Sequence, residues 1–247
     1  MKFTQKNTTT VMTMTLLGAL VLTAAKPVLA DGMIPETSVV IVNEADGEAT
    51  MKVTNSDAVA SLLHVKVLDI PEDKEPLLLV TPSVARVEAG KTQQVRFILR
   101  TGNAPLKTQR MKRASFEGIA SQKRENEAGE SRVGVGVRQN LPVIIHPKGL
   151  ARNDSPWTGL QWSLANGKLT VSNPTAYVVR LSPDVTLMPS QTRAQMTKSY
   201  VLPGEKLDVS VTGAAASASA VRFVPATVYG FAVKHYDAPL NGKNITR

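Results

Sequence analysis

Cysteine is absent from this sequence of 247 residues. Its absence excludes disulfide bonds, iron–sulfur clusters, zinc sites with thiolate ligands and thiol catalysis. Histidine is scarce as well: only His64, His146 and His235 occur, and they lie too far apart in the sequence to suggest a local metal-binding motif. The sequence therefore predicts neither a bound metal nor another cofactor.

Aromatic residues make up only 4% of the chain, whereas hydrophobic residues make up 43% and charged residues 20%. The last two values are typical of a folded globular protein, and the length allows one large or two ordinary domains. The chain lacks the aromatic platforms on which single-stranded nucleic acids stack. Its formal net charge of +9 permits an acidic partner without demanding nucleic acid, and we expect no nucleic-acid partner.

The first 30 residues have the pattern of a secretory signal peptide. Lys2 and Lys6 provide a positive start, Val11–Ala25 is apolar, and Val28-Leu29-Ala30 is a small-residue cleavage site before Asp31. The alternative is a membrane anchor, but the apolar stretch is short for the roughly 20 residues that span a bilayer. We expect cleavage after residue 30 and export of a cysteine-free chain, which fits a bacterial periplasm.

After Asp31 the chain alternates short β-type runs with turn signals and shows no convincing amphipathic helix. Regularly spaced strands of this kind predict an all-β fold of the sandwich type. The polar segment between Pro147 and Pro156 predicts a domain boundary, giving domains at 31–147 and 148–247. The predicted strands are Ser38–Val42, Ala49–Asn55, Leu62–Leu68, Leu77–Thr81, Gln94–Arg100, Arg110–Ile119, Arg132–His146, Leu160–Ala165, Lys168–Val171, Tyr177–Met188, Leu207–Thr212, Arg222–Val228 and Gly230–His235, with Asn166-Gly167 as a hairpin turn.

Motifs that suggest catalysis are incomplete in this sequence. The run Gly134-Val135-Gly136-Val137 begins like a dinucleotide fingerprint but lacks the third glycine and a following helix. No serine elbow occurs, and no histidine has a serine and an acid at a suitable spacing. We therefore expect neither an enzyme nor a small-molecule substrate.

Charged residues cluster in two places. The basic cluster Lys107, Arg110, Lys112 and Arg113 could meet phosphates or an acidic partner, but we expect a solvated edge strand. The acidic neighbours Glu72 and Asp73 fall in a predicted turn, where we expect them to be solvated.

The segment Thr81-Pro82-Ser83-Val84-Ala85-Arg86-Val87-Glu88-Ala89-Gly90, followed by Val95-Arg96, resembles the signature of the PapD-like periplasmic pilus-assembly chaperones. The turn Val171-Ser172-Asn173-Pro174-Thr175-Ala176-Tyr177 and the strand from Arg132 to Pro147 also resemble family features. The resemblance implies two tandem immunoglobulin-like β-sandwich domains. It also implies a periplasmic chaperone without catalytic activity that caps pilus or fimbrial subunits by donor-strand complementation and delivers them to an outer-membrane usher.

The lending strand is expected in the segment Arg132–Arg138, where Val133, Val135 and Val137 share one face and glycines occupy the other. The pattern alone leaves two readings open, because the valines could plug a subunit's groove or face the domain's own core. The resemblance favours the donor reading, since glycines weaken an ordinary strand.

The family anchors the subunit's terminal carboxylate with an arginine on the first strand and a lysine on the lending strand. Here Val39 and Pro142 stand at those positions. Arg138 and Lys148 are the candidate replacements, and the alternative is that both are solvated. Where relatives place a hinge arginine this chain has His146, for which a weaker pairing with Glu117 is the less favoured alternative.

A second function also fits the sequence, namely a structural or adhesive immunoglobulin-like sandwich protein of a surface fibre. A fibre subunit of this pathway should lack a strand and carry a free donor extension, whereas both halves of this chain contain full sets of predicted strands. Self-association through a free strand edge is a further open prediction.

Overall fold

The computed structural model describes residues 32–100, 102, 104–120, 137–213, 218–231 and 233–241. The predicted signal peptide lies outside these residues. From Asp31 onward the chain forms one compact unit, and its described part is built from strands with one short 3₁₀ helix, η1 (Pro156–Gly159). No helix in this described part is long and apolar enough to cross a membrane.

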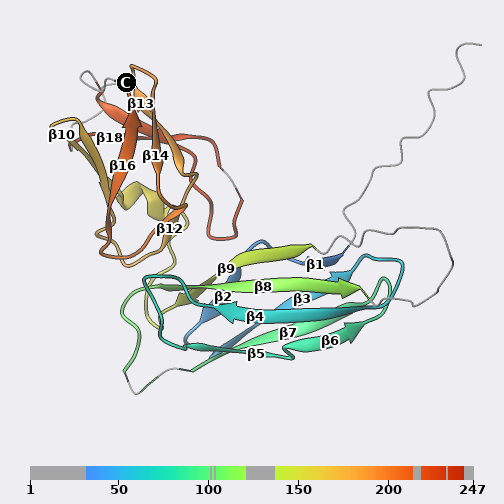
Figure 1. Ribbon diagram of the computed structural model, residues 1–247. Coiled ribbons are helices and arrows are strands. Elements are labelled where there is room, and N and C mark those ends of the chain that lie inside the picture. The colour runs from blue at the N-terminus through green and yellow to red at the C-terminus, as the bar shows by residue number, and fades with distance from the viewer. Residues whose placement is uncertain are drawn as a thin grey trace, which may run out of the picture. The chain divides into compact units, whose positions relative to one another are not determined.

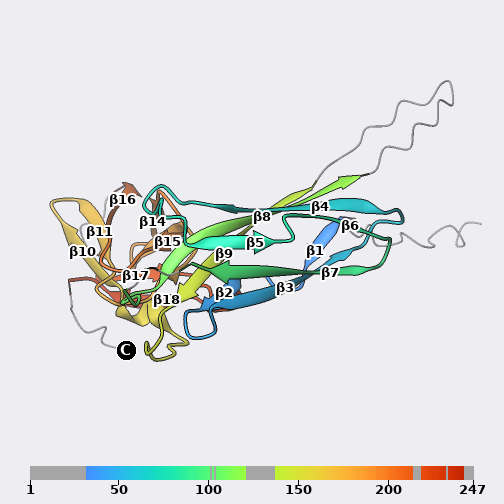
Figure 2. The same ribbon diagram turned by 90° about the horizontal axis from the view of Figure 1, so that it is seen from below.

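The first domain contains two sheets, whose strands run along a common direction in Figures 1 and 2. One sheet has the order β1-β3-β7-β5 and the other β2-β9-β8-β4-β6. All pairs are antiparallel except β2 and β9, which are parallel. The strands are β1 (Met33–Pro35), β2 (Val40–Asn43), β3 (Glu48–Asn55), β4 (Ser61–Leu68), β5 (Leu78–Thr81), β6 (Val84–Val87), β7 (Thr92–Leu99), β8 (Arg110–Ala120) and β9 (Arg138–His146).

Alternation along these strands builds the core between the two sheets. In β7, Val95 and Phe97 are buried while Gln94 and Arg96 are exposed, which is the two-residue period of a strand with one face in a core. Phe97 meets Phe116 of β8 edge to face, with ring centroids 6.3 Å apart. The remaining core is mainly aliphatic, as the scarcity of aromatic residues predicts.

The second domain has one seven-stranded sheet, β10-β11-β16-β14-β13-β17-β18, and the small pair β12-β15. The large sheet curls, because Trp162 of β10 bridges to Leu240 just after β18 and so brings the two ends together around one core. The strands are β10 (Gln161–Ala165), β11 (Lys168–Ser172), β12 (Val179–Arg180), β13 (Asp184–Met188), β14 (Thr192–Met196), β15 (Tyr200–Val201), β16 (Lys206–Thr212), β17 (Ala220–Phe223) and β18 (Tyr236–Pro239). The all-β prediction is confirmed.

Several strand boundaries differ from the sequence-based expectation. The hairpin at Asn166-Gly167 is confirmed, and both residues have positive φ, at 51° and 74°. The predicted strand Tyr177–Met188 was wrong, because the chain leaves β12 near Pro183 and enters the large sheet as β13. The predicted strand Gly230–His235 was also wrong, since Gly230 has a φ of 87° and closes a turn, and pairing resumes only at β18.

One buried asparagine plays the same role in each domain. The side-chain amide of Asn55 donates to the carbonyls of Val59 and Val87, and that of Asn173 donates to the carbonyls of Tyr177 and Val201. Each asparagine is fully buried. Each asparagine therefore satisfies one buried carbonyl and one part-buried carbonyl of its domain.

The prediction that the basic cluster forms a solvated edge strand was wrong. β8 lies in the middle of its sheet, between β4 and β9, and Lys112 on it is only 1% exposed. The Lys112 ammonium donates to Asp73 and Asp69, and Arg110 binds both carboxylate oxygens of Asp73. The expectation that Asp73 is solvated was therefore wrong as well. Its carboxylate neutralises the positive charge of Lys112, which would be costly to bury unpaired.

Candidate functional site

The edge of β9 is open along half of its length. β8 pairs with the whole strand, whereas β2 pairs only with its last part, from Val143 to His146. Among the described residues nothing pairs with the other side of β9 from Arg138 to Pro142. Pro142 carries no N–H and is tolerated because it lies on this open edge. An extended segment of another chain could add there as a further strand.

One of the valines expected to act as a donor stripe, Val137, lies at the start of this edge. Val137 directly precedes β9 and is 44% exposed. Val137 and Val143 are six residues apart, so their side chains lie on the same face of the strand. Val143 on this face is buried in the core, whereas Val137 near the start of β9 is exposed. Val133 and Val135 lie outside the described residues, and their orientation stays a prediction.

The two candidate carboxylate anchors lie in different surroundings. Arg138 donates to Glu117 across the β8–β9 pair, with an Nη2–Oε2 distance of 2.8 Å. This exposed ion pair already supplies Arg138 with an acidic partner. Lys148 is exposed beyond the end of β9, and its backbone N–H donates to Glu44. Binding of a subunit's terminal carboxylate by either residue stays a prediction.

An apolar cluster joins the two domains. Ile144 of β9 and Met111 of β8 come from the first domain, and Val178 and Tyr200 come from the second. Val39, at the position where the family carries an arginine, is 4% exposed and belongs to the same cluster. This packing fixes the base of a cleft between the domains.

A polar relay beside this cluster also links the domains. The backbone N–H of Val178 donates to Gln109 Oε1 at 2.9 Å, and Gln109 Nε2 lies 2.9 Å from His146 Nδ1. The Leu150 carbonyl can only accept a hydrogen bond, so we assign the ring hydrogen of His146 to Nε2, which donates to it. Nδ1 then accepts a hydrogen bond from Gln109. The less favoured alternative, a pairing of His146 with Glu117, does not form, since the two side chains lie toward opposite ends of the sheet.

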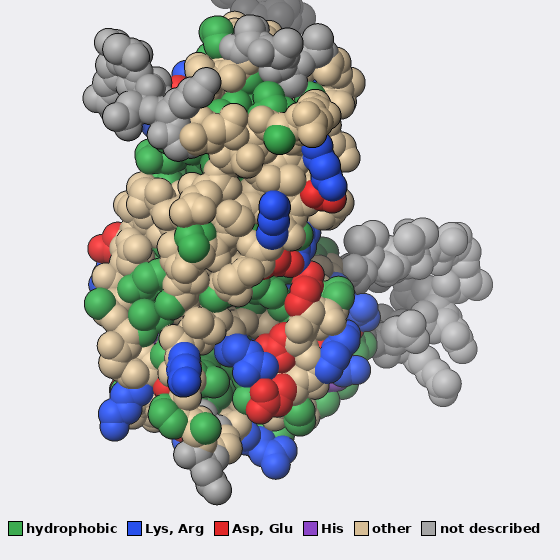
Figure 3. Space-filling view, turned by 90° about the vertical axis from the view of Figure 1, so that its left-hand side faces the viewer, with side chains coloured by type: hydrophobic (Ala, Val, Ile, Leu, Met, Phe, Trp, Pro, Cys, Tyr) green, Lys and Arg blue, Asp and Glu red, His purple; other side chains and the backbone are tan. Residues whose placement is uncertain are grey.

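The loop between β4 and β5 reaches the second domain through Glu72. Its carboxylate accepts hydrogen bonds from the Lys198 ammonium and from the Tyr200 hydroxyl, the latter at 3.0 Å, and Glu205 also binds Lys198. Burial, together with the bond to Glu72, raises the pKa of Tyr200 to about 12, so this hydroxyl stays protonated and donates. The expectation that Glu72 is simply solvated was wrong. Figure 3 shows acidic and basic side chains side by side on the face it draws.

Two half-buried arginines at the cleft lack an acidic partner such as the one that the buried Lys112 has. Arg113 lies opposite Pro142 and donates to Asn140, while Arg180 donates to the carbonyls of Thr227 and Val228. Within the described parts of the chain, neither guanidinium forms an ion pair. Burial lowers the pKa of both groups, and the charge of Arg113 further lowers that of Arg180. An anion bound here would relieve this repulsion.

These arginines stand beside the positions where the family carries its anchoring pair. Arg113 faces Pro142 across the β8–β9 pair. Arg180 Nη1 lies close to Ser38, the residue before Val39. A Cβ atom built on Gly230 would lie 3.7 Å from Arg180 Nη1 and 2.2 Å from the Ser38 hydroxyl oxygen, so both groups surround the same point. The sequence singled out Arg113 only as part of the basic cluster that was expected to be solvated, and it gave no signal for Arg180. The two residues lie on strands that are distant in sequence.

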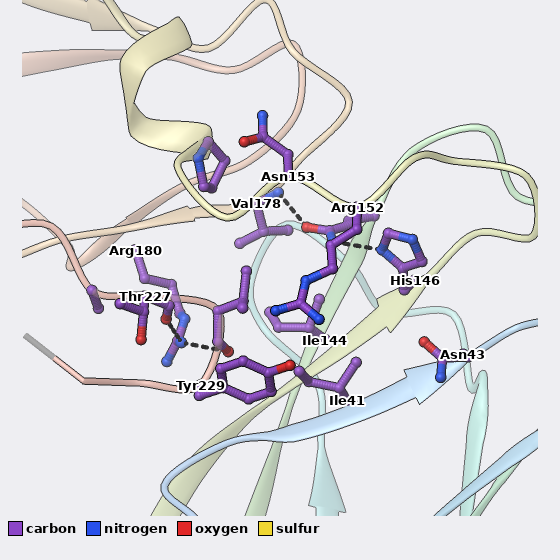
Figure 4. Close-up of a pocket in the computed structure, with 14 residues that line it drawn as sticks. Ile41, Asn43, Ile144, His146, Arg152, Asn153, Val178, Arg180, Thr227 and Tyr229 are labelled. Carbon is purple, nitrogen blue, oxygen red and sulfur yellow. Dashed lines mark hydrogen bonds between the residues drawn. The ribbon is translucent and has the colours of Figure 1, made fainter.

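A cavity of about 420 Å³ opens at the same cleft (Figure 4). Its apolar lining includes Ile41, Ile144 and Val178, and Arg180 and Arg152 supply positive charge. Its polar lining is not a metal site, because the described residues contain no group of three acidic or histidine side chains able to hold an ion. Its chemistry suits an anionic group attached to an apolar segment.

Two family models match this chain. The first, described as the pili and flagellar-assembly chaperone PapD N-terminal domain, matches residues 32–151, and the second, the pili assembly chaperone PapD C-terminal domain, matches residues 155–236. A fimbrial chaperone of Escherichia coli K12 called YhcA, itself described as uncharacterized, is 38% identical over 216 residues, covering 87% of this chain and 93% of the relative. The chaperone protein FimB/FhaD of Bordetella pertussis is 29% identical over 178 residues, covering 67% and 72%.

Solved structures share the fold. The Salmonella enterica SafA pilin in complex with the SafB chaperone includes a chain that matches with a TM-score of 0.70 and 19% identity, covering 86% of this chain and 98% of that chain. The E. coli chaperone DraB matches with a TM-score of 0.68 and 19% identity, covering 85% and 98%. Together with the two family models, which span both domains, these observations establish that the chain belongs to the PapD family of pili assembly chaperones.

Proposed function

We propose that this chaperone captures fimbrial subunits by lending them the edge strand that begins at Val133 and continues into β9. The observation that carries the proposal is the open edge of β9 between Arg138 and Pro142. Backbone hydrogen bonds along this edge would supply affinity, and alternate side chains would fill pockets of an incomplete sandwich. Val133, Val135 and Val137 are the proposed inserting side chains. The role is one of binding rather than catalysis.

The proposal includes a cellular setting. A chain cleaved after residue 30 would act in the periplasm and would pass its cargo to an outer-membrane usher. The proposed domains are 31–147, which carries the lending strand, and 148–247. The side-by-side arrangement of acidic and basic side chains in Figure 3 supports a protein partner rather than nucleic acid, because nucleic acid favours a surface of one sign.

We further propose that Arg113 and Arg180 bind the terminal carboxylate of the captured subunit. Arg138 already pairs with Glu117, and Lys148 lies beyond the hinge, whereas the two cleft arginines have no acidic partner among the described residues. A carboxylate between them would form charge-assisted hydrogen bonds of the strong kind. Arg138 and Lys148 stay alternative predictions, and the same titration tests all four.

Val137→Asp tests the lending strand. Because Val137 is 44% exposed, the free protein should melt within about 2 °C of wild type. Subunit capture should be lost, since an unpaired carboxylate would enter an apolar groove. Val84→Asp is the matched control, because Val84 is 53% exposed on the distant strand β6, and it should capture normally. Normal capture by Val137→Asp would overturn the proposal.

Val135→Asp extends the test to a residue outside the described part of the chain. If the stripe inserts into the subunit, the free variant melts like wild type and captures nothing. If Val135 instead belongs to the core of the first domain, the free variant should lose several kcal/mol of stability and melt far below wild type. That fall in melting temperature would refute the donor role of this stripe.

The anchor is tested by titrating a subunit against Arg113→Gln and Arg180→Gln. Each variant should lose about 1.5–3 kcal/mol of affinity, roughly 10- to 150-fold, and the loss should disappear when the subunit's terminal carboxylate is amidated. Arg138→Ala and Lys148→Ala serve as the comparison. A loss confined to one of these two would move the anchor to that residue.

A further inference from the structure

A tight turn of the second domain carries two exposed aromatic rings and lies close to β2 and to the paired part of β9. Phe231 is 71% exposed and Tyr229 is 46% exposed, both on the segment between β17 and β18. In Figure 1 this segment extends from the second domain toward β9, and Figure 4 shows Tyr229 close to Ile41 and Ile144. Neither ring belongs to the core of its own domain.

The turn is held firmly although its side chains are exposed. The N–H of Thr227 donates to the carbonyl of Phe231, the N–H of Gly230 donates to the carbonyl of Thr227, and the N–H of Phe231 donates to the Thr227 hydroxyl. Arg180 also donates to the carbonyl of Thr227 and to that of Val228. An exposed aromatic ring on a well-ordered turn loses little conformational entropy when a partner covers it.

Contacts with the first domain fix where the turn lies. The Ser38 hydroxyl donates to the carbonyl of Tyr229 at 3.2 Å. Gly230 lies so close to Ser38 that a Cβ there would approach the hydroxyl to 2.2 Å. Ser38 comes two residues before β2, whose first residue Val40 is in register with Val143. The turn therefore stands next to the point where the open part of the β9 edge ends.

We propose that Phe231 and Tyr229 form an apolar lip that packs against the last side chains of the captured subunit's strand. The inference rests on the proposed function, because it places a subunit's carboxyl end at Arg113 and Arg180. The lip adjoins that cationic site through Arg180, and Arg152 lies 5.5 Å from the centre of the Tyr229 ring. An occupant that is apolar and ends in a carboxylate fits both features. The lip selects subunits with a large apolar side chain near the carboxyl terminus.

The test uses the subunit that co-purifies with the wild-type chaperone, identified by mass spectrometry and re-expressed as the probe. Phe231→Ala should weaken its binding roughly tenfold, as expected for losing part of the burial of one aromatic ring. Phe231→Leu should retain most of the affinity. Leu79→Ala is the matched control, because Leu79 is 50% exposed on β5 of the other domain, and its binding should not change.

A double-mutant cycle then identifies the contact. Replacing the large apolar residue nearest the subunit's carboxyl end by alanine should weaken binding to wild type but add little to the effect of Phe231→Ala. Equal binding by Phe231→Ala and wild type, or an equal loss in Leu79→Ala, would overturn the lip. If Val137→Asp still abolishes capture in that case, the proposed function stands and only the lip fails. If wild type itself does not bind the subunit, both fail.

Discussion

The buried ammonium of Lys112 allows a strong test of how charge stabilises the first domain. Its Nζ atom donates to Asp73 Oδ1 at 3.0 Å, to the Asp73 carbonyl at 2.7 Å and to Asp69 Oδ1 at 2.8 Å. Arg110 binds both oxygens of the Asp73 carboxylate, at 2.6 and 2.7 Å. Asp73→Ala would therefore leave a buried cation with one carboxylate, that of Asp69, whose side chain is 39% exposed.

The magnitude follows from this geometry. Breaking a buried ion pair by removing one partner costs about 3–5 kcal/mol, and the remaining Asp69 keeps the expected cost near the lower end, about 3 kcal/mol. For a chain of this size that corresponds to a fall in melting temperature of roughly 6–12 °C, measured by calorimetry. Glu75→Ala is the control, because Glu75 is 57% exposed and its bond to Arg110 contributes less than about 1 kcal/mol. A fall no larger than that of the control would refute the buried ion pair.

The same variant predicts a pH dependence. Burial alone would raise the pKa of Asp73, but hydrogen bonds from Arg110 and Lys112 outweigh it and hold the pKa below its ordinary value. A carboxylate with a depressed folded-state pKa contributes stability above its unfolded pKa of about 3.9 and loses it as the pH falls through the folded pKa. The difference between wild type and Asp73→Ala should therefore be full at neutral pH and shrink below about pH 4. A constant difference through that range would contradict the assignment.

Two further predictions concern the buried asparagines and the link between the domains. Asn173→Ala should destabilise the second domain by about 1–3 kcal/mol in denaturant unfolding, because one buried and one part-buried carbonyl lose their donor, and Asn55→Ala should do the same in the first domain. Glu72→Gln should change overall stability by less than about 1 kcal/mol, since this carboxylate is partly exposed, but should lower the pKa of Tyr200 from about 12 toward the ordinary value of about 10 in a spectrophotometric titration. An unchanged tyrosine titration would show that Glu72 does not hold the Tyr200 hydroxyl.

Strands in which apolar and polar residues alternate strictly were predictable from the sequence, and strands without this alternation were not. β4 alternates buried and exposed residues through most of its length, and the Asn-Gly turn between β10 and β11 has an unmistakable local signal. β14 was missed, because Ala194 and Met196 are its only buried residues among polar neighbours. Short strands such as β1 and β15 depend on partners that are distant in sequence, and no local pattern reports them.

The candidate site was only partly predictable for a related reason. The proposed lending strand has a local period-two pattern, so a valine stripe could be proposed there without a structure, and its donor role stays a prediction. The sequence did not identify Gln109 as the partner of His146, because the choice between Glu117 and Gln109 depends on where along the sheet each side chain falls. The lip at Phe231 had no sequence signal, since an exposed aromatic residue in a loop acquires meaning only from what the turn touches.

Lys112 and Arg113 show why charge alone does not separate a structural residue from a binding residue. They are neighbours on β8, so their side chains leave opposite faces of the sheet. Lys112 turns into the core, where two aspartates neutralise it, and there its charge stabilises the fold. Arg113 turns toward the cleft, where it meets Asn140 and, within the described chain, no acid. The second charge is therefore the one left available for a ligand, and a one-residue shift in the register of β8 would exchange the two roles.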